Sequence, residues 1–293
     1  MKRKELLKRL DLSTFIAFDF ETTGLDYQND KIIEVAAIKF IDGEIADRYV
    51  ELVNPGMSIP SVITEITGIS DKMVRSSPSE ELIIDDLLSF IGDNPLVAHN
   101  IHFDEKFLYQ LCKRLGRDVL KNAQYDTLQL ARSVLYDQPV FNLSALSEYF
   151  GLSSKGAHRA EKDTENTGLI FLELVHEVSK YPLETISRVN SMIKGTSIPN
   201  QKLYVNLGNE LTKNGDLKMG LLEFDKPRKS MSNSFSYLGK NDIGEISSEQ
   251  VFGDNGLLSL SHPNFESRPN QQKYAQMVDE MINEDQSKGV IEA

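Results

Sequence analysis

The stretch FIAFDFETTGL, residues 15–25, places two carboxylates in a segment that otherwise has the composition of a buried strand. Side chains two positions apart on a strand point the same way, so Asp19 and Glu21 project together. Two like charges about 4 Å apart repel by about 4 kcal/mol at an effective dielectric near 20. Such a pair persists when a proton is shared or when a cation lies between the groups. An isolated pair would more simply be the solvated face of an edge strand, so the rest of the chain must decide.

The bulk composition is that of a globular protein. A length of 293 residues accommodates one large domain or two smaller ones. No apolar run approaches the roughly 20 residues of a membrane span, and the N-terminus lacks the apolar core of a secretory signal. The one cysteine, Cys112, excludes an internal disulfide framework and suits a reducing compartment, so we expect a cytoplasmic protein. The net charge of −12 argues mildly against a nucleic-acid binder, unless part of that charge belongs to a metal site.

The order of the expected elements indicates an α/β domain with a mixed sheet. Strands are expected over residues 15–21, 31–43, 44–53 and 95–100, with a hairpin at Asp42-Gly43. Helices are expected over residues 77–93, 104–116, 127–136, 143–150 and 160–180. Two short helices could follow at 183–195 and 201–213, residues 213–262 have the composition of a linker, and a last helix is expected from Pro269.

Two further acids stand where other elements begin. Asp104 opens a helix in HNIHFDEKF, and Asp163 lies on the helix after the loop in GAHRAEKDTENT. The fold could gather both with Asp19 and Glu21 at the C-terminal edge of the first strand. Such hard oxygen ligands suit Mg²⁺ or Mn²⁺. Two of these ions a few Å apart activate a water and stabilise the leaving oxygen in phosphodiester hydrolysis.

Three motifs in order resemble the DEDDh exonucleases, a DnaQ-like family with the proofreading-exonuclease, ribonuclease H-like fold. The motifs are FDFETTGL, HNIHFD and HRAEKD, and the segments at 54–74 and 125–132 are also similar. The resemblance covers about residues 12–180. It implies a mixed five-stranded sheet flanked by helices, with an exonuclease domain over residues 1–182. It also implies 3′→5′ hydrolysis at the 3′ ends of single-stranded DNA, with RNA as an open alternative.

The same resemblance implies a role for each matching residue. Asp19, Glu21 and Asp163 would hold the metal ion that carries the attacking water, and Asp19 would bridge to a second ion. Asp104 would complete the site, partly through water. His158 would be the general base, because its unperturbed pKa lies near neutrality.

Residues for substrate contact are also implied by the resemblance. The backbone near Thr22 and Thr23 would meet the 3′-terminal nucleotide, and Leu25 would be an apolar wall against the terminal base. Phe103 would be a second wall or, with equal weight, part of the core. The full set expected to contact substrate is Thr22, Thr23, Leu25, His99, Asn100 and Phe103. We expect His99 to be a structural hydrogen-bonding residue rather than a metal ligand, and Asp126 to be a helix N-cap.

The C-terminal residues 263–293 resemble the opening of the DinG-type helicases of superfamily 2. Arg268 and Gln271 would match an adenine-reading segment there; the alternative is that Pro269 begins an ordinary helix and Gln271 is a surface residue. No GxxxxGK[ST] loop occurs in the sequence, so ATP binding is expected only if a helicase domain follows. We therefore expect a helical and linker region over 183–262 and a truncated helicase start over 263–293.

These features together predict a metal-dependent 3′→5′ exonuclease that belongs to a DinG-like nuclease–helicase. The alternative is an epsilon-like proofreading subunit of a replicative DNA polymerase, which would use the same chemistry. A scaffold that only binds DNA is the alternative of a different class, and the intact acidic set argues against it. The sequence predicts no membrane association and assigns no protein partner.

Overall fold

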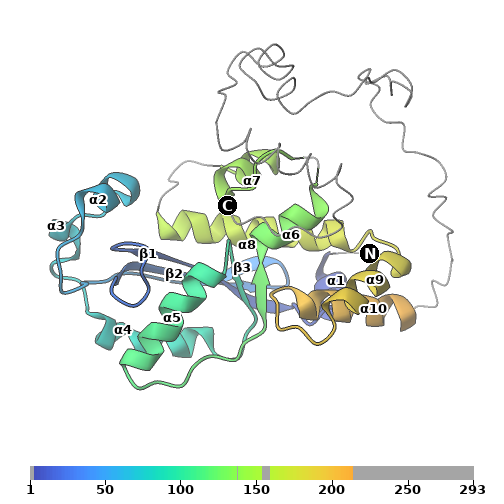
Figure 1. The fold of residues 1–293 in the computed structure, drawn as a ribbon, viewed down its shortest axis with the longest axis horizontal. Helices are drawn as coiled ribbons and strands as arrows, with labels where there is room; N and C mark the ends of the chain where they lie inside the picture. The colour runs from blue at the N-terminus through green and yellow to red at the C-terminus, as the bar shows by residue number, and fades with distance from the viewer. Residues whose placement is uncertain (1–2, 137, 154–158, 214–293) are drawn as a thin grey trace, which may run out of the picture. The chain divides into compact units, whose positions relative to one another are not determined.

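Five strands form one mixed sheet in the order β3-β2-β1-β4-β5 (Figure 1). Their bounds are β1 Thr14–Thr22, β2 Ile32–Ile41, β3 Glu44–Leu52, β4 Leu96–Ala98 and β5 Gln124–Asp126. Strand β1 lies at the centre, antiparallel to β2 and parallel to β4. The computed structural model describes residues 3–136, 138–153 and 159–213. The expectations for the linker and for Arg268, Pro269 and Gln271 lie outside those ranges.

Helices cover both faces of this sheet, as Figure 1 shows for α6, α7 and α8 on one face and α4 and α5 on the other. Their bounds are α1 Arg3–Arg9, α2 Ser61–Thr67, α3 Asp71–Val74, α4 Glu80–Ile91, α5 His102–Arg114, α6 Thr127–Val134, α7 Leu143–Tyr149, α8 Ala160–Val178, α9 Leu183–Ile193 and α10 Gln201–Lys213. The expected mixed five-stranded sheet flanked by helices is confirmed. None of the helices in the described ranges is both long and apolar enough to cross a membrane.

Strand β1 serves two hydrophobic cores because its side chains alternate between the faces of the sheet. Phe15 and Ala17 belong to the core under α8, and Ile16, Phe18 and Phe20 belong to the core that α4 and α5 cover. Asp19 and Glu21 continue the alternation of the first pair. The two acids therefore lie on the α8 face, at the end of the strand where the apolar core stops.

Most expected elements are present within a few residues of their predicted bounds. The Asp42-Gly43 hairpin is confirmed, with both residues at positive φ (54° and 88°), as a tight hairpin turn requires. The side chain of Asp126 caps α6 as expected, accepting from the amides of Leu128 and Gln129. The sequence did not predict β5, which is three residues long, or α1, α2 and α3. These elements are too short to show a clear periodicity.

Helices α9 and α10 pack into the same core as the sheet. Ile186, Leu203 and Leu207 are buried members of the core under α8. Asn200, just before α10, donates to the carbonyl of Asp126 and accepts from its amide, both at 3.0 Å. The edge of this core therefore does not coincide with the domain boundary expected at residue 182, and residues 183–213 share one compact unit with the sheet.

Helix α8 lies close against the sheet at Gly168. An ideal Cβ on Gly168 would lie 2.3 Å from Cε2 of the Phe40 ring. That ring is fully buried and stacks on Phe15 with 4.8 Å between centroids, so it has little room to move. The absence of a side chain at residue 168 thus sets the height of α8 above β1 and β2.

We expect Gly168→Ala to destabilise the protein, although alanine in a helix interior usually adds about 1 kcal/mol relative to glycine. Overpacking against a rigid ring costs about 1–3 kcal/mol and should outweigh that gain. Gly208→Ala in α10 is the matched control, because its nearest contact, at 2.8 Å, is the end of the Asn190 side chain rather than a buried, stacked ring. Urea unfolding of both variants measures the difference. Equal midpoints would show that the Phe40 contact does not constrain α8.

Candidate active site

Four carboxylates from three elements converge at the C-terminal end of β1. Asp19 and Glu21 come from β1 itself, Asp104 from the first turn of α5 and Asp163 from the first turn of α8. Because β4 ends at Ala98, the backbone of β1 beyond Ala17 has no strand partner on that side. Asp104 takes the place of a partner, since its Oδ1 accepts from the amide of Phe20 at 3.1 Å.

Electrostatic coupling shows that these carboxylates are near one another. Burial raises the pKa of Asp19 well above its usual value, and the charges of Asp104, Glu21 and Asp163 raise it further. Burial raises the pKa of Glu21 to about 7, with Asp163 the next cause. Burial also raises the pKa of Asp104 to about 8, against the hydrogen bond from Phe20 that lowers it. Each of the acids that were predicted to converge therefore makes the ionised form of its neighbours less favourable.

The chemistry of this donor set fits hard divalent cations. All four groups are carboxylates, and oxygen ligands of this kind suit Mg²⁺ and Mn²⁺. A cation would also remove the repulsion that raises the pKa values of Asp19 and Glu21. In the part of the chain that the structure describes, no three acidic, histidine or cysteine side chains are arranged as a ready-made metal site.

The loop after β1 carries an exposed apolar residue on a well-anchored base. Leu25 is 83% exposed, whereas Thr22 and Thr23 are buried. Thr23 Oγ1 donates to Asp30 Oδ1 at 2.9 Å, and Asp30 Oδ2 accepts from the amide of Asp26 at 2.9 Å. Asp30 thus fixes the base of the exposed loop that carries Leu25, four residues after Glu21. Sequence reasoning missed Asp30, which no motif distinguishes from a surface residue.

The residues after β4 have mainly structural contacts. His99 Nδ1 lies 2.9 Å from Thr127 Oγ1, and burial lowers the pKa of His99, as suits the expected structural hydrogen bond. Asn100 adopts a positive φ of 66°, which asparagine tolerates better than most residues. Phe103 is half-buried and lies against Phe107, with ring centroids 5.0 Å apart. The substrate contacts of Thr22, Thr23, Leu25 and these three residues stay predictions.

The expected general base, His158, lies outside the described residues. The two residues after it, Arg159 and Ala160, both contact Glu34 of β2. Glu34 is only 1% exposed and lies opposite Glu21 in the pairing of β1 with β2. Sequence reasoning missed Glu34 and Arg159. A charged residue inside the apolar run KIIEVAAIKF was the available signal.

The raised pKa values predict how the stability of the metal-free protein depends on pH. A carboxyl whose folded pKa lies above its unfolded pKa stabilises the fold below the unfolded value, and that contribution is lost as pH rises through the folded value. For Glu21 the window runs from the ordinary glutamate pKa of 4.5 to the raised pKa of about 7. The melting temperature in EDTA should therefore fall between pH 5 and pH 8, and Glu21→Gln should flatten the fall.

Asp85→Asn is the control for that measurement. A hydrogen bond from Arg117 lowers the pKa of Asp85, so this exposed group does not titrate in the same window. The Asp85 variant should keep the wild-type slope between pH 5 and pH 8. A wild-type slope that Glu21→Gln leaves unchanged would show that Glu21 is already charged at pH 5.

Known proteins resemble this chain over about two-thirds of its length. The PolC-type DNA polymerase III of Caldanaerobacter subterraneus subsp. tengcongensis is 36% identical over 191 residues, which cover 65% of this chain and 14% of that protein. Its counterpart from Staphylococcus saprophyticus is 35% identical over 195 residues, covering 67% and 13%. The chain thus spans about one-seventh of the length of these relatives.

Solved structures agree on the fold. E. coli Exonuclease I in complex with a dT13 oligonucleotide has a TM-score of 0.53 and 19% identity, covering 66% of this chain and 46% of that one. The expected DinG-type context receives no support from these relatives, and the proofreading alternative fits them better. The family described as Exonuclease matches residues 16–171, more than half of the chain. A chain with this match, this sheet and this acidic cluster belongs to the exonuclease family.

Proposed function

We propose that this chain removes nucleotides in the 3′→5′ direction from single-stranded DNA ends, in the manner of a proofreading exonuclease. The observation that carries the proposal is the cluster of Asp19, Glu21, Asp104 and Asp163 at the end of β1, with three pKa values raised. The similarity to PolC-type DNA polymerase III supports the proofreading role. The Exonuclease I neighbour bound to an oligonucleotide supports single-stranded DNA as the substrate.

Exonucleases of this family use divalent metal ions, and one Exonuclease I–DNA complex is described as a zinc-bound form. Here Asp19, Glu21 and Asp163 would hold one ion, with Asp19 and Asp104 holding a second. Bound ions of this kind activate water and offset the charge of the leaving oxygen. The protein's own contribution is to hold the carboxylates together and to place an exposed apolar residue, Leu25, where a terminal base can rest on it.

A free 3′ end suits this site better than a duplex. The described part of the site offers the apolar side chain of Leu25 and the backbone of Thr22 and Thr23, which read no particular base. A terminal nucleotide must leave its stack to reach the carboxylates, and a mismatched nucleotide does so at lower cost. The proposed role in proofreading follows from that difference.

The proposal predicts metal-dependent release of nucleotides from 3′ ends. A 5′-labelled DNA strand should shorten stepwise with Mg²⁺ or Mn²⁺, and a 3′-labelled strand should lose its label at once. Asp19→Asn should abolish this activity, because a neutral amide is a poor ligand for these cations. The variant's melting temperature in EDTA should equal or exceed that of the wild type, since one repelling charge is gone.

Two further substrates test the proofreading role. A primer with a mismatched 3′ nucleotide on its template should be trimmed faster than the matched primer, and an RNA strand of the same sequence tests the sugar preference. Activity that persists in EDTA, or label released first from the 5′ end, would contradict the proposed exonuclease. Equal rates on matched and mismatched primers would contradict the proofreading role but not the exonuclease activity.

The role of His158 as general base remains a prediction from the HRAEKD motif. His158→Ala should lower the turnover number about 10²–10⁴-fold while metal and DNA binding are largely kept. The wild-type rate should rise as pH passes the histidine pKa, and that rise should be absent from the variant. His102→Ala is a suitable control, because His102 is an exposed residue on α5. An unchanged pH profile in the His158 variant would assign the base to another group.

A further inference from the structure

Glu34 is a buried fifth acid beside the four carboxylates of the site. Its charge raises the pKa of both Asp19 and Glu21, so it adds to the repulsion there. A buried ion pair seldom stabilises a fold more than apolar residues of similar volume would. Stability alone therefore does not account for an acid at residue 34, and its contacts point to another role.

The carboxylate of Glu34 is held by two neighbouring residues at the start of α8. Arg159 Nη2 donates to Oε1 at 2.6 Å, and Arg159 Nε lies 3.3 Å from Oε2. The amide of Ala160, the first residue of α8, donates to Oε2 at 3.0 Å. A helix N-terminus favours a negative charge. An arginine that donates two hydrogen bonds to one carboxylate fixes the orientation of the two side chains as well as their separation. Glu34 thus ties the helix end to β2 at a defined orientation.

The contact of Glu34 with Arg159 and Ala160 lies next to two residues of the proposed metal site, Glu21 and Asp163. Glu34 is the cross-strand partner of Glu21, and side chains opposite each other on neighbouring strands are close. The amide of Asp163 donates to the carbonyl of Arg159 at 3.2 Å, one helical turn along α8. A shift of Arg159 would therefore carry Asp163 with it.

We propose that Glu34 and Arg159 are positioning residues, which hold the first turn of α8 so that Asp163 faces Glu21. Neither residue is assigned a contact with substrate or metal. The inference rests on the proposed exonuclease function, in which Asp163 and Glu21 share a cation. It gives Arg159 of the HRAEKD motif a role that the sequence analysis left open.

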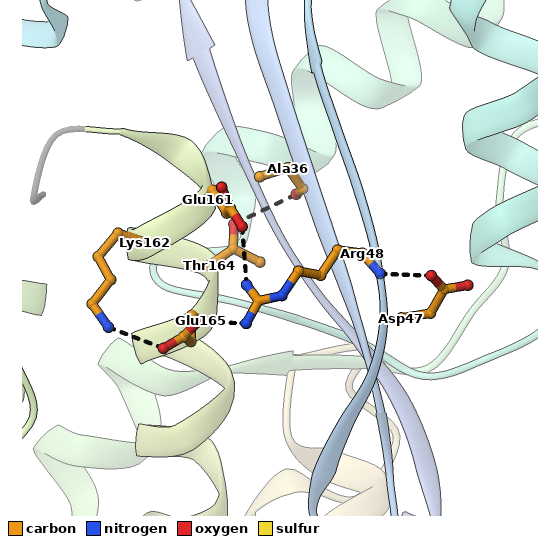
Figure 2. A network of polar contacts seen from close by, with 7 residues as sticks. All are labelled: Ala36, Asp47, Arg48, Glu161, Lys162, Thr164 and Glu165. Carbon is orange, nitrogen blue, oxygen red and sulfur yellow. Dashed lines mark hydrogen bonds and ion pairs between the residues drawn. The ribbon is translucent and has the colours of Figure 1, made fainter.

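A second set of ion pairs, between β3 and the same helix, provides the matched control. Arg48 of β3 donates to Glu161 at 3.2 Å and to Glu165 at 2.6 Å. Figure 2 shows this arrangement of the three side chains. Glu165 also accepts from Lys162 at 3.0 Å, which leaves it partnered when Arg48 is removed. These ion pairs are partly exposed and do not include Glu34, which is buried. Loss of Arg48 should loosen the helix surface and leave the site in place.

The experiment compares Glu34→Ala, Arg159→Ala and Arg159→Lys with Arg48→Ala. Amide hydrogen exchange in EDTA reports the first turn of α8, residues 160–163, against residues 170–178 of the same helix. Titration with Mn²⁺ alone reports the metal affinity, and kcat and KM on a single-stranded DNA report activity. Arg159→Lys keeps the positive charge but cannot donate two parallel hydrogen bonds to the carboxylate. This variant replaces Arg159→Ala in the comparison if the alanine variant folds poorly.

Positioning and simple electrostatics predict opposite results for Arg159→Ala. Removal of a cation whose charge acts on Glu21 should strengthen Mn²⁺ binding if charge alone matters. If Arg159 positions Asp163, Mn²⁺ binding and kcat should instead fall about 10–100-fold in both alanine variants, with KM changed by less than about 3-fold. Exchange at residues 160–163 should become faster, and Arg159→Lys should restore only part of the activity. Arg48→Ala should keep kcat within about 2-fold of the wild type.

Tighter Mn²⁺ binding by Arg159→Ala with normal turnover would overturn the proposal in favour of a charge effect. Equal losses in Arg48→Ala would also overturn it, because any loosening of α8 would then suffice. Unchanged exchange at residues 160–163 would show that the tie does not order the helix end. A wild-type protein inactive on every strand would instead refute the proposed function, while the exchange and Mn²⁺ measurements would still test the tie.

Discussion

Repulsion among carboxylates at the end of β1 is the constraint on which the rest of the site depends. Burial and mutual charge raise the pKa values of Asp19, Glu21 and Asp104, so the protein forces together groups that would otherwise separate. Rigid elements must resist that separation. The central strand supplies two of the acids, and α5 and α8 each bring one from an opposite face of the sheet. The two hydrophobic cores are therefore also the supports of the acidic cluster.

The packing of α8 shows how a core contact outside the acidic cluster contributes to the placement of Asp163. Gly168 lets the helix rest on the Phe40 ring, and Asp163 lies little more than one turn before it. The contact at residue 168 fixes the height of the helix, while the tie between Glu34 and Arg159 fixes its end. Two independent contacts on one rigid helix determine where Asp163 lies, since a helix pinned at two points cannot pivot.

Sequence alone could predict the parts of the site that local periodicity encodes. The i, i+2 spacing of Asp19 and Glu21, the hairpin at Asp42 and the cap at Asp126 all rest on neighbouring residues. The missed features depend on distant partners. Glu34 meets Arg159 across 125 positions, and its role is invisible until the strand register is known. β5 has three residues and no period to detect. The His158 loop and residues 214–293 lie outside the described ranges, so the expectations there stay untested.

Residues beyond the family match also support the edge of the site. Asn200 bonds to both backbone groups of Asp126, and its own amide donates to the carbonyl of Gln124 at 2.9 Å. The side chain of Asp126 in turn accepts from the amide of Asn100, in the motif that leads to Asp104. This series of hydrogen bonds runs from the start of α10 through β5 to the second motif. The match ends at residue 171, yet the hydrogen bonds that hold Asp126 beside the second motif come from Asn200. The folding unit that holds the acids is therefore larger than the segment that identifies the family.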